Sequence, residues 1–322
     1  MPVQPPQSAH RDPTAWHRVP LPTTCDVAAA EAFCRDVASR HYENFTVATR
    51  LVPSSLRQHL ANVYAYARWS DDLADEAASP AVAARDLTAW RQGLEDCFAG
   101  RPGHPVYVAL AETVRQTGLT MEPFAHLLDA FEEDQAFDSA GTSVRYADRA
   151  ALVAYCRRSA DPVGRIVLAL EGCRDTGLVA MSDSICTGLQ LVNFWQDVHR
   201  DRLAGRVYFP LADMRQHGVT EAMLDAPRAA VPLQSLLRAE VAWARECFDA
   251  GAALEHVGPR VLRPAIGMFL AGGRAVADAI ERAGFDTVAR RPTLGKWTKL
   301  RLAARAWWRL QTTPRRLAGG VS

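Results

Sequence analysis

From Asp26 onward, apolar residues recur every three or four positions through long stretches rich in Ala, Leu, Arg and Glu. This period places them along one face of a helix and is typical of amphipathic helices that pack on a core. Alternating β-branched runs bounded by hairpin turns, the usual sign of strands, are missing from the sequence. The pattern therefore predicts an all-α protein.

Turn-forming residues divide this helical sequence into segments. Pro ends a helix because it lacks an amide hydrogen, and Gly favours the left-handed turn that follows one. The spaces between the breaks accommodate about nine to eleven helices. The breaks lie near residues 52–53, 79–80, 100–105, 118–123, 139–143, 175–177, 205–210, 226–227 and 258–259.

The length and composition fit one large domain with short tails. The 322 residues are 48% hydrophobic and 23% charged, which are the proportions of an ordinary globular protein. Residues 1–24 contain six prolines, which disfavour both helix and strand, so we expect a disordered tail there. We expect residues 25–289 to form the main helical domain and residues 290–322 to form a separate basic segment.

The basic C-terminal segment, residues 290–322, has no acidic residue and contains Trp297, Trp307 and Trp308. One interpretation is that it lies on an anionic membrane surface, with the basic side chains at the headgroups and the indoles in the interface. The other is a last helix that packs its Trp side chains on the core and leaves a basic face in water. The two interpretations are compatible.

Charge and cysteine content exclude several classes of protein. A net charge of +1 gives no overall attraction to nucleic acid. The seven cysteines include no Cys-x-x-Cys pair, which argues against a zinc site and a disulfide framework. The N-terminus lacks the features of a secretory signal, and no apolar stretch approaches the roughly 20 residues of a membrane span. We expect a cytoplasmic protein, peripheral on the inner face of the membrane if its C-terminal segment binds lipid.

The first acidic motif lies within residues 64–76, which contain no Gly or Pro. Asp71 and Asp75 are one helical turn apart, and so are Asp72 and Glu76. Like charges at this spacing destabilise a helix by about 0.2–0.5 kcal/mol per pair, so a compensating cation is expected. Mg²⁺ is suitable because it binds oxygen and bridges one or two carboxylates to substrate phosphates. By itself, the motif also fits a solvated acidic helix face.

The second acidic motif consists of Asn193, Asp197 and Asp201. On one continuous helix this spacing spreads the three side chains over about 80° of one face and along about 12 Å. Mostly apolar neighbours indicate that the helix is buried, with its oxygen ligands in a cavity. By itself, the pattern also fits salt bridges to Arg200 and Arg202.

The presence of both motifs in one chain favours a catalytic interpretation. Two oxygen-rich helices can hold several Mg²⁺ ions around one diphosphate, and the metals then neutralise the leaving group as its C–O bond ionises. We therefore expect Mg²⁺, or alternatively Mn²⁺, as the cofactor. His199 and His41 invite an acid–base role, but a lone His more often serves as a hydrogen-bonding residue.

The chain resembles the trans-isoprenyl diphosphate head-to-head synthases, the squalene and phytoene synthase family, from about Phe33 to Lys299. This resemblance implies a single large helical bundle of the isoprenoid synthase type with a central active-site cavity. It is carried by His41-Tyr42-Glu43-Asn44-Phe45, residues 64–76, residues 155–164, residues 190–201, Gly205-Arg206-Val207-Tyr208-Phe209-Pro210 and Ala283-Gly284-Phe285-Asp286.

The resemblance implies roles for individual residues, which we state as expectations. The metal ligands are Asp71, Asp72, Asp75, Asn193, Asp197 and Asp201, with Glu76 as a helper. The diphosphate is steadied by Arg68, Tyr64, His41 and Asn44. Tyr155 and Gln190 line the site of the reacting carbons, and Asn193 also contacts substrate. The groups expected to take part directly in catalysis are Asp71, Asp75, Tyr155, Asp197 and Arg68.

Two stretches are most similar to the bacterial hydroxysqualene synthase branch of the family: residues 41–45 and residues 159–165. This similarity implies conversion of presqualene diphosphate to hydroxysqualene, without NAD(P)H, alongside a presqualene diphosphate synthase and a flavin-dependent desaturase. One alternative is head-to-head condensation of two farnesyl or geranylgeranyl diphosphates to presqualene diphosphate, squalene or phytoene. A second alternative is an inactive membrane-associated scaffold for prenyl enzymes.

Asp161 departs from the usual family pattern, which has Gly at this position. One interpretation is that its carboxylate orients a water that captures a carbocation. The simpler one, which we favour, is a helix kink at Pro162 with Asp161 as its cap.

Overall fold

The computed structural model describes residues 25–41, 51–139 and 145–295, and every regular element within these ranges is a helix. The all-α prediction is confirmed. The described ranges contain thirteen α-helices and one 3₁₀ helix, more than the nine to eleven expected, and ten of the α-helices have ten or more residues. The tail of residues 1–24 and most of the basic C-terminal segment lie outside the described ranges, so the predictions for them remain predictions.

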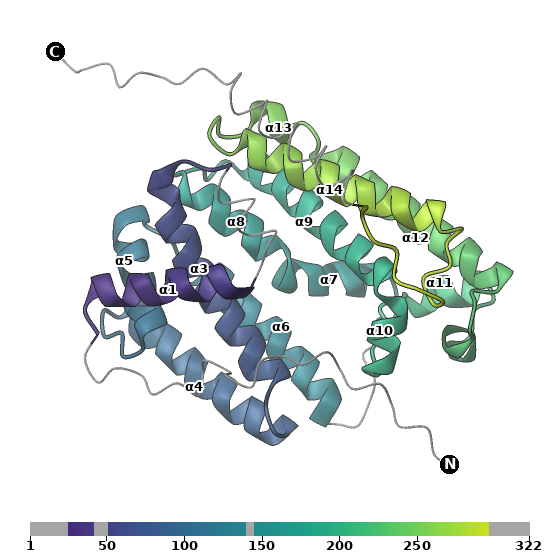
Figure 1. Cartoon of the computed structure of the whole chain (residues 1–322), viewed down its shortest axis with the longest axis horizontal. Helices are drawn as coiled ribbons and strands as arrows, with labels where there is room; N and C mark the ends of the chain where they lie inside the picture. The colour runs from purple at the N-terminus through teal and green to yellow at the C-terminus, as the bar shows by residue number, and fades with distance from the viewer. Residues whose placement is uncertain (1–24, 42–50, 140–144, 296–322) are drawn as a thin grey trace.

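The helices fall into two groups in Figure 1, one purple to blue and one teal to yellow. The first group contains α1 (Val27–His41), α3 (Ser54–Asp75), α4 (Pro80–Phe98), α5 (Pro105–Thr117) and α6 (Glu122–Ser139). The second contains α7 (Arg149–Ser159), α8 (Asp161–Leu170), α9 (Thr176–Gln196), α10 (Val198–Leu203), α11 (Leu211–Gln216), a 3₁₀ helix η2 (Glu221–Asp225), α12 (Val231–Gly251), α13 (Leu254–Val257) and α14 (Arg263–Arg282).

The predicted breaks coincide with helix starts that the local sequence explains. The Ser79 hydroxyl accepts a hydrogen bond from the amide of Val82, and Pro80 occupies the first turn of α4. Such a side chain satisfies an amide that has no partner within the helix, and Pro there loses no intrahelical bond. Asp148 and Asp175 cap α7 and α9 in the same way.

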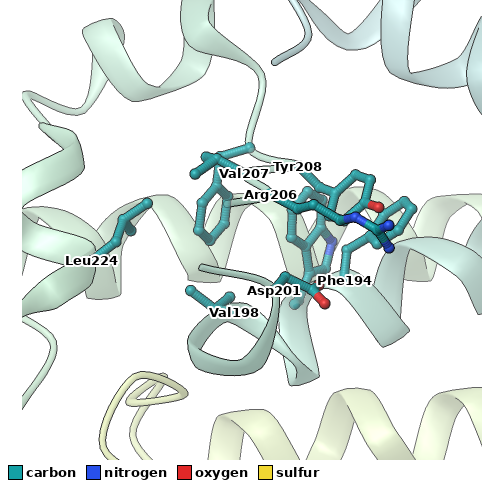
Figure 2. A pocket seen from close by; sticks show the side chains of 9 residues that line it. Phe194, Val198, Asp201, Arg206, Val207, Tyr208 and Leu224 are labelled. Carbon is teal, nitrogen blue, oxygen red and sulfur yellow. The ribbon is translucent and has the colours of Figure 1, made fainter. Parts of the chain in front are cut away.

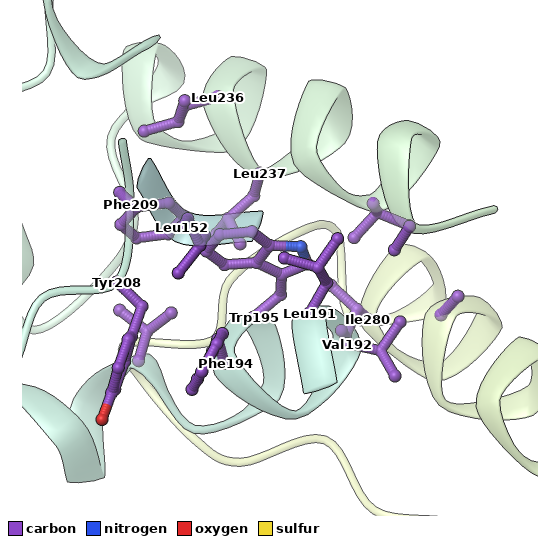
Figure 3. Close-up of a cluster of buried hydrophobic side chains, with 14 of the residues drawn as sticks. Leu152, Leu191, Val192, Phe194, Trp195, Tyr208, Phe209, Leu236, Leu237 and Ile280 are labelled. Carbon is purple, nitrogen blue, oxygen red and sulfur yellow. The ribbon is translucent and has the colours of Figure 1, made fainter. Parts of the chain in front are cut away.

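The buried side chains form two hydrophobic clusters, one for each group of helices. The first joins α1, α3, α4, α5 and α6 and includes the C-terminal half of α8. The second joins α7, α9, α12 and α14. At its centre Trp195 stacks on Phe209 with ring centroids 4.9 Å apart (Figure 3). Helix α6 packs against both α4 and α7 and therefore connects the two groups.

Two glycines let α9, α12 and α14 approach one another closely. A Cβ atom on Gly188 would lie 2.8 Å from the ring of Phe248, and one on Gly273 would lie 2.4 Å from the same ring. Phe248 is fully buried on α12. The missing side chains therefore create the space that this aromatic ring fills.

None of the helices in the described ranges combines the length and apolar character that crossing a lipid bilayer requires.

Candidate active site

Helix α3 is anchored through the face opposite to its acidic motif. The Tyr66 hydroxyl donates to the carbonyl oxygen of Phe124 on α6 at 2.9 Å, and the indole of Trp90 on α4 donates to the Ser70 hydroxyl at 2.9 Å. Both Tyr66 and Ser70 are fully buried. These bonds fix the rotation of α3 and thereby the direction of the motif residues that follow Ser70.

The carboxylates of the first motif divide between a cavity and an internal ion pair. Asp71 and Asp75 line a cavity, whereas Asp72 is buried and pairs with Arg68. Arg68 also pairs with Asp71 at 3.0 Å and lies 3.9 Å from Glu76. The single positive charge of Arg68 therefore offsets part of the negative charge of the motif.

The second motif does not lie on one continuous helix as predicted. Helix α9 ends at Gln196, and Asp197 has φ −102° and ψ 14° before α10 begins at Val198. The amide of Asp201 still donates to the carbonyl oxygen of Asp197 at 2.9 Å. The regular helix is therefore interrupted at Asp197 without loss of that hydrogen bond, and Asp201 belongs to the short helix α10 rather than to α9.

Arg291 contacts the second motif at this bend. It pairs with the Asp197 carboxylate, and its Nη2 donates to Gln196 Oε1 at 3.1 Å. The Gln196 side chain in turn donates to the carbonyl oxygen of Pro292. Asn193, one turn before Asp197, is exposed.

A tight turn after α10 brings Arg206 back beside the acidic motifs. Gly205 adopts φ +77°, a left-handed conformation that is favourable mainly for glycine. The amide of Arg206 then donates to the carbonyl oxygen of Asp201 at 2.8 Å. Figure 2 shows the side chains of Arg206, Tyr208 and Phe194 grouped together, with the Asp201 carboxylate close by.

Two adjoining cavities connect the motifs. One of about 220 Å³ is bordered by α3, α6, α7, α9 and the Arg206 turn; a second, more open one of about 550 Å³ is bordered by Asp75, Arg200, Asp201 and Arg206. Asp75 and Arg206 line both, and Arg206 Nη2 lies 3.8 Å from Asp75 Oδ1. The two acidic motifs thus face each other across Arg206.

An aromatic wall borders the smaller cavity. Phe194 and Tyr208 stack with centroids 3.8 Å apart at 11°, and Tyr155 lies 6.2 Å from Tyr208. The Tyr155 hydroxyl donates to Asp134 Oδ2 on α6 at 2.9 Å. Apolar residues Leu127, Ala130 and Phe131 complete the α6 side. The cavity therefore combines a charged end with apolar and aromatic surfaces.

Burial perturbs two carboxyl groups of the site. Burial and the neighbouring Asp197 raise the pKa of Asp201 to about 7, although the positive charge of Arg206 opposes the shift. Burial raises the pKa of Asp134 to about 6, and Arg206 again opposes it. In both cases the main cause is the loss of water around the charged form, and carboxyl groups with perturbed pKa values are frequent at functional sites.

The structure brings together many of the residues predicted from sequence. Asp71, Asp75, Tyr155 and Gln190 line the smaller cavity, and Asp75 and Asp201 line the larger one. The predicted residues that line neither cavity are Tyr64, Arg68, Asp72, Glu76, Asn193 and Asp197. The side chain of His41 and all of Asn44 are outside the described part of the chain.

Several residues of the site were absent from the prediction: Asp134, Gln135, Ser159, Arg206 and Tyr208 line its cavities, and Arg291 pairs with its second motif. Arg206 and Tyr208 belong to a stretch that carried the family resemblance, so a signal for them existed. Asp134 stands in an acidic run on α6, and only its burial distinguishes it from the neighbouring acids.

Asp161 is placed away from these cavities. It is buried at the start of α8, where the Thr187 hydroxyl on α9 donates to its Oδ1 at 2.9 Å. The predicted break in the helix is confirmed, since α7 ends at Ser159 and α8 begins at Asp161. The predicted cap is wrong, because no side-chain bond caps α8.

The donor set fits a metal that shares its ligands with a substrate. Among the described residues no three His, Cys, Asp or Glu side chains form a group that could hold a metal ion by themselves. Mg²⁺ usually takes only one or two carboxylates and completes its octahedron with phosphate oxygens and water. Asp71 and Asp75 on one side and Asp201 on the other are placed for such shared coordination.

Comparison with known proteins identifies relatives along most of the chain. A family model described as squalene/phytoene synthase matches residues 38–298. The phytoene synthase of Thermus thermophilus is 30% identical over 87% of this chain and 93% of its own length. The phytoene synthase of Arthrospira platensis is 29% identical over 83% of this chain and 89% of its own length.

A solved structure extends the comparison to three dimensions. The crystal structure of squalene synthase HpnC from Alicyclobacillus acidocaldarius superimposes with a TM-score of 0.76 and is 38% identical in sequence. The match covers 80% of this chain and 95% of that one.

Proposed function

Since this chain belongs to the squalene/phytoene synthase family, we propose that it ionises a prenyl diphosphate and converts presqualene diphosphate and water into hydroxysqualene and diphosphate. The observation that carries the proposal is the arrangement of two acidic motifs around Arg206, beside a cavity with an aromatic wall. The 38% identity to a squalene synthase, against 29–30% to the phytoene synthases reported above, supports a squalene-type product.

The charged end of the site suits the diphosphate. Arg200 and Arg206 line the larger cavity and can donate charge-assisted hydrogen bonds to its oxygens. Bound Mg²⁺ would supply Lewis-acid stabilisation of the charge that develops on the leaving diphosphate. We assign its ligation to Asp71, Asp75 and Asp201, which line the cavities. Asp72, Asn193 and Asp197 are retained as ligands implied by the family resemblance.

The apolar and aromatic surfaces suit the hydrocarbon and its cation. Leu127, Ala130 and Phe131 offer an apolar side to a prenyl chain. The rings of Tyr155 and Tyr208 present electron-rich faces, which stabilise a nearby cation by about 0.5–2 kcal/mol. Burial of this wall also limits the access of bulk water, so that the cation persists long enough to rearrange.

The second candidate function is head-to-head condensation of two prenyl diphosphates, which requires the same metal motifs. The phytoene synthases among the relatives favour this reading. The test is incubation of the purified protein with Mg²⁺ and either presqualene diphosphate, farnesyl diphosphate or geranylgeranyl diphosphate, followed by identification of the lipid product by mass spectrometry. We expect hydroxysqualene from presqualene diphosphate. Consumption of farnesyl or geranylgeranyl diphosphate alone would establish condensation instead.

Replacement of Asp71 by Asn distinguishes an enzyme from a scaffold. The substitution keeps the size of the side chain and removes the charge that the proposed ion requires, so we expect turnover to fall by at least about 100-fold. Asp86→Asn, at a surface acid on α4 that pairs with Arg85, is the control and should retain full activity. Equal activity of the two variants would contradict the enzymatic role of the motif.

A further inference from the structure

Asp134 lines the smaller cavity, and one of its carboxylate oxygens is buried without a hydrogen-bond partner among the described residues. Its Oδ2 accepts the Tyr155 hydroxyl at 2.9 Å, whereas Oδ1 is buried and accepts no hydrogen bond in the described structure. The residue is 8% exposed and lines the cavity. A buried polar atom without a partner is rare in native proteins and marks a place for water or ligand.

Ser159 provides a second polar atom of the same kind. It follows Tyr155 by four residues on α7, so the two side chains lie on one face, about 6 Å apart along the axis. Ser159 lines the same cavity, and its buried hydroxyl has no hydrogen-bond partner among the described residues. A cavity of about 220 Å³ has room for a water of about 30 Å³ beside part of a substrate.

We propose that Asp134 and Ser159 hold the water that captures the carbocation, and that Asp134 accepts its proton; this inference rests on the proposed hydration reaction. The water oxygen forms the new C–O bond to the cationic carbon while one water O–H bond breaks. The proton passes to Asp134 Oδ1, so the carboxylate becomes neutral and later returns the proton to solvent. The bond to diphosphate has broken before this step, and no oxidant or reductant takes part.

The surroundings of Asp134 suit a general base. The Tyr155 hydroxyl holds the carboxylate through Oδ2 and leaves Oδ1 of this cavity-lining residue without a hydrogen-bond partner among the described residues. Burial raises the pKa of Asp134 to about 6, which makes it a stronger base than an exposed aspartate while it remains largely ionised at neutral pH. Asp161, the acid considered from sequence, binds Thr187 and does not line either cavity.

The test compares the products of four proteins supplied with presqualene diphosphate and Mg²⁺ in H₂¹⁸O: the unsubstituted chain, Asp134→Asn, Ser159→Ala and Asp129→Asn. Asp129 is the matched control, since it lies on the same helix but pairs with Arg91 on α4 at 2.7 Å. Each assay measures diphosphate release, ¹⁸O-labelled alcohol and the hydrocarbons formed by proton loss. Circular dichroism and thermal unfolding establish that each variant is folded.

We expect Asp134→Asn to lower the ratio of labelled alcohol to hydrocarbon by about tenfold or more, because a positioned base contributes at least this much. Ser159→Ala should lower it less, and Asp129→Asn should leave it unchanged. An unchanged ratio in folded Asp134→Asn overturns the role of Asp134, even if diphosphate release slows. Absence of labelled alcohol with the unsubstituted chain overturns the proposed hydration itself, so the two failures are distinct.

Discussion

Arg206 is the residue at which the charges of the site converge. Its guanidinium lies 3.8 Å from Asp75, and its charge opposes the rise in pKa at both Asp134 and Asp201. It is also one of two arginines on the larger cavity. The side chain therefore offsets the charge of neighbouring carboxylates, and in the proposed function it would also bind the diphosphate of the substrate.

Replacement of Arg206 by Met tests the second role. Met retains much of the length and loses the charge, so Mg²⁺–diphosphate should bind about 10- to 100-fold more weakly, as expected for a charged hydrogen bond. Isothermal titration calorimetry measures this change. Arg215→Met, at an exposed position on α11, should bind normally. Equal affinity of the two variants would exclude Arg206 from the diphosphate site.

Asp134 illustrates what the sequence does not reveal at this scale. Three acids in a row, Glu132, Glu133 and Asp134, read equally well as a solvated helix face. In the structure the first two pair with Arg91 and Arg158 respectively. Asp134 alone of the three is buried. The distinction depends on contacts between α6 and α7, which no local pattern encodes.

At the scale of helices, adjacent glycines on α14 should respond in opposite ways to the same substitution. A methyl group on Gly273 meets the Phe248 ring at 2.4 Å, whereas one on Gly272 meets nothing within 4 Å. We expect Gly273→Ala to lower the free energy of unfolding by about 1–3 kcal/mol through overpacking. Gly272→Ala should raise it by about 0.5–1 kcal/mol, because alanine favours the helix. Urea unfolding measures both, and destabilisation by both variants would contradict the close approach.

The junction of α7, α11 and α12 contains a buried acid, Glu240. It is fully buried, and Arg149 Nη2 lies 3.4 Å from its Oε1 while Arg149 Nε donates to Asp213 at 2.6 Å. Burial, followed by the interaction with Asp213, raises the pKa of Glu240 to about 8 from 4.5. Between these two values the native state holds a proton that the unfolded chain has lost, so stability falls as pH rises through this window.

Replacement of Glu240 by Gln should remove this part of the pH dependence. The free energy of unfolding of the unsubstituted chain should fall between pH 5 and pH 8, and the fall should be smaller in Glu240→Gln by roughly 2 kcal/mol. Urea unfolding at both pH values is the measurement. Glu246→Gln, at an exposed position on the same helix, should retain the full pH dependence. A Glu240→Gln profile that matches this control would refute the assignment.

Helix boundaries were predicted well where the sequence provides a cap or a proline, as at Ser79 and Pro80. The bend at Asp197 was missed because the sequence around it contains no Gly or Pro. At the bend, Arg291 pairs with Asp197, and the carbonyl oxygen of Pro292 accepts a hydrogen bond from Gln196 at the end of α9. Pairing of residues nearly a hundred positions apart is a tertiary effect, and local propensity gives no sign of it.

At the scale of the whole molecule, the two acidic motifs belong to different groups of helices, and a shared ligand should connect them. Mg²⁺ with inorganic diphosphate should therefore raise the unfolding temperature more than the sum of the two separate effects. At 100 times the dissociation constant a ligand adds about 2.7 kcal/mol, which corresponds to several degrees. Differential scanning fluorimetry detects this shift.

The double variant Asp71→Asn with Asp201→Asn is the control for this experiment. It removes one proposed ligand from each group of helices, so the additional shift with both ligands together should disappear. A cooperative shift that persists in the double variant would show that Mg²⁺ and diphosphate bind elsewhere on the protein.

The overall architecture was predictable because it depends on repeated local signals. Apolar periodicity and turn residues recur along most of the chain, so an error in the predicted bounds of one helix does not alter the all-α prediction. The active-site geometry depends on a few long-range contacts, such as that of Tyr155 with Asp134 on another helix. The motifs could be named from sequence, whereas the cavity residues that join them required the packed structure.

The division of the buried hydrophobic residues into two clusters has a consequence for engineering the thermostability of the protein. The smaller cavity draws its walls from both clusters, with α3 on one side and α7 and α9 on the other. Substitutions that stabilise only one cluster would leave the other to unfold first on heating, and the active site would be lost when that cluster unfolded. An effective engineering strategy would therefore distribute its substitutions evenly between the two halves of the protein.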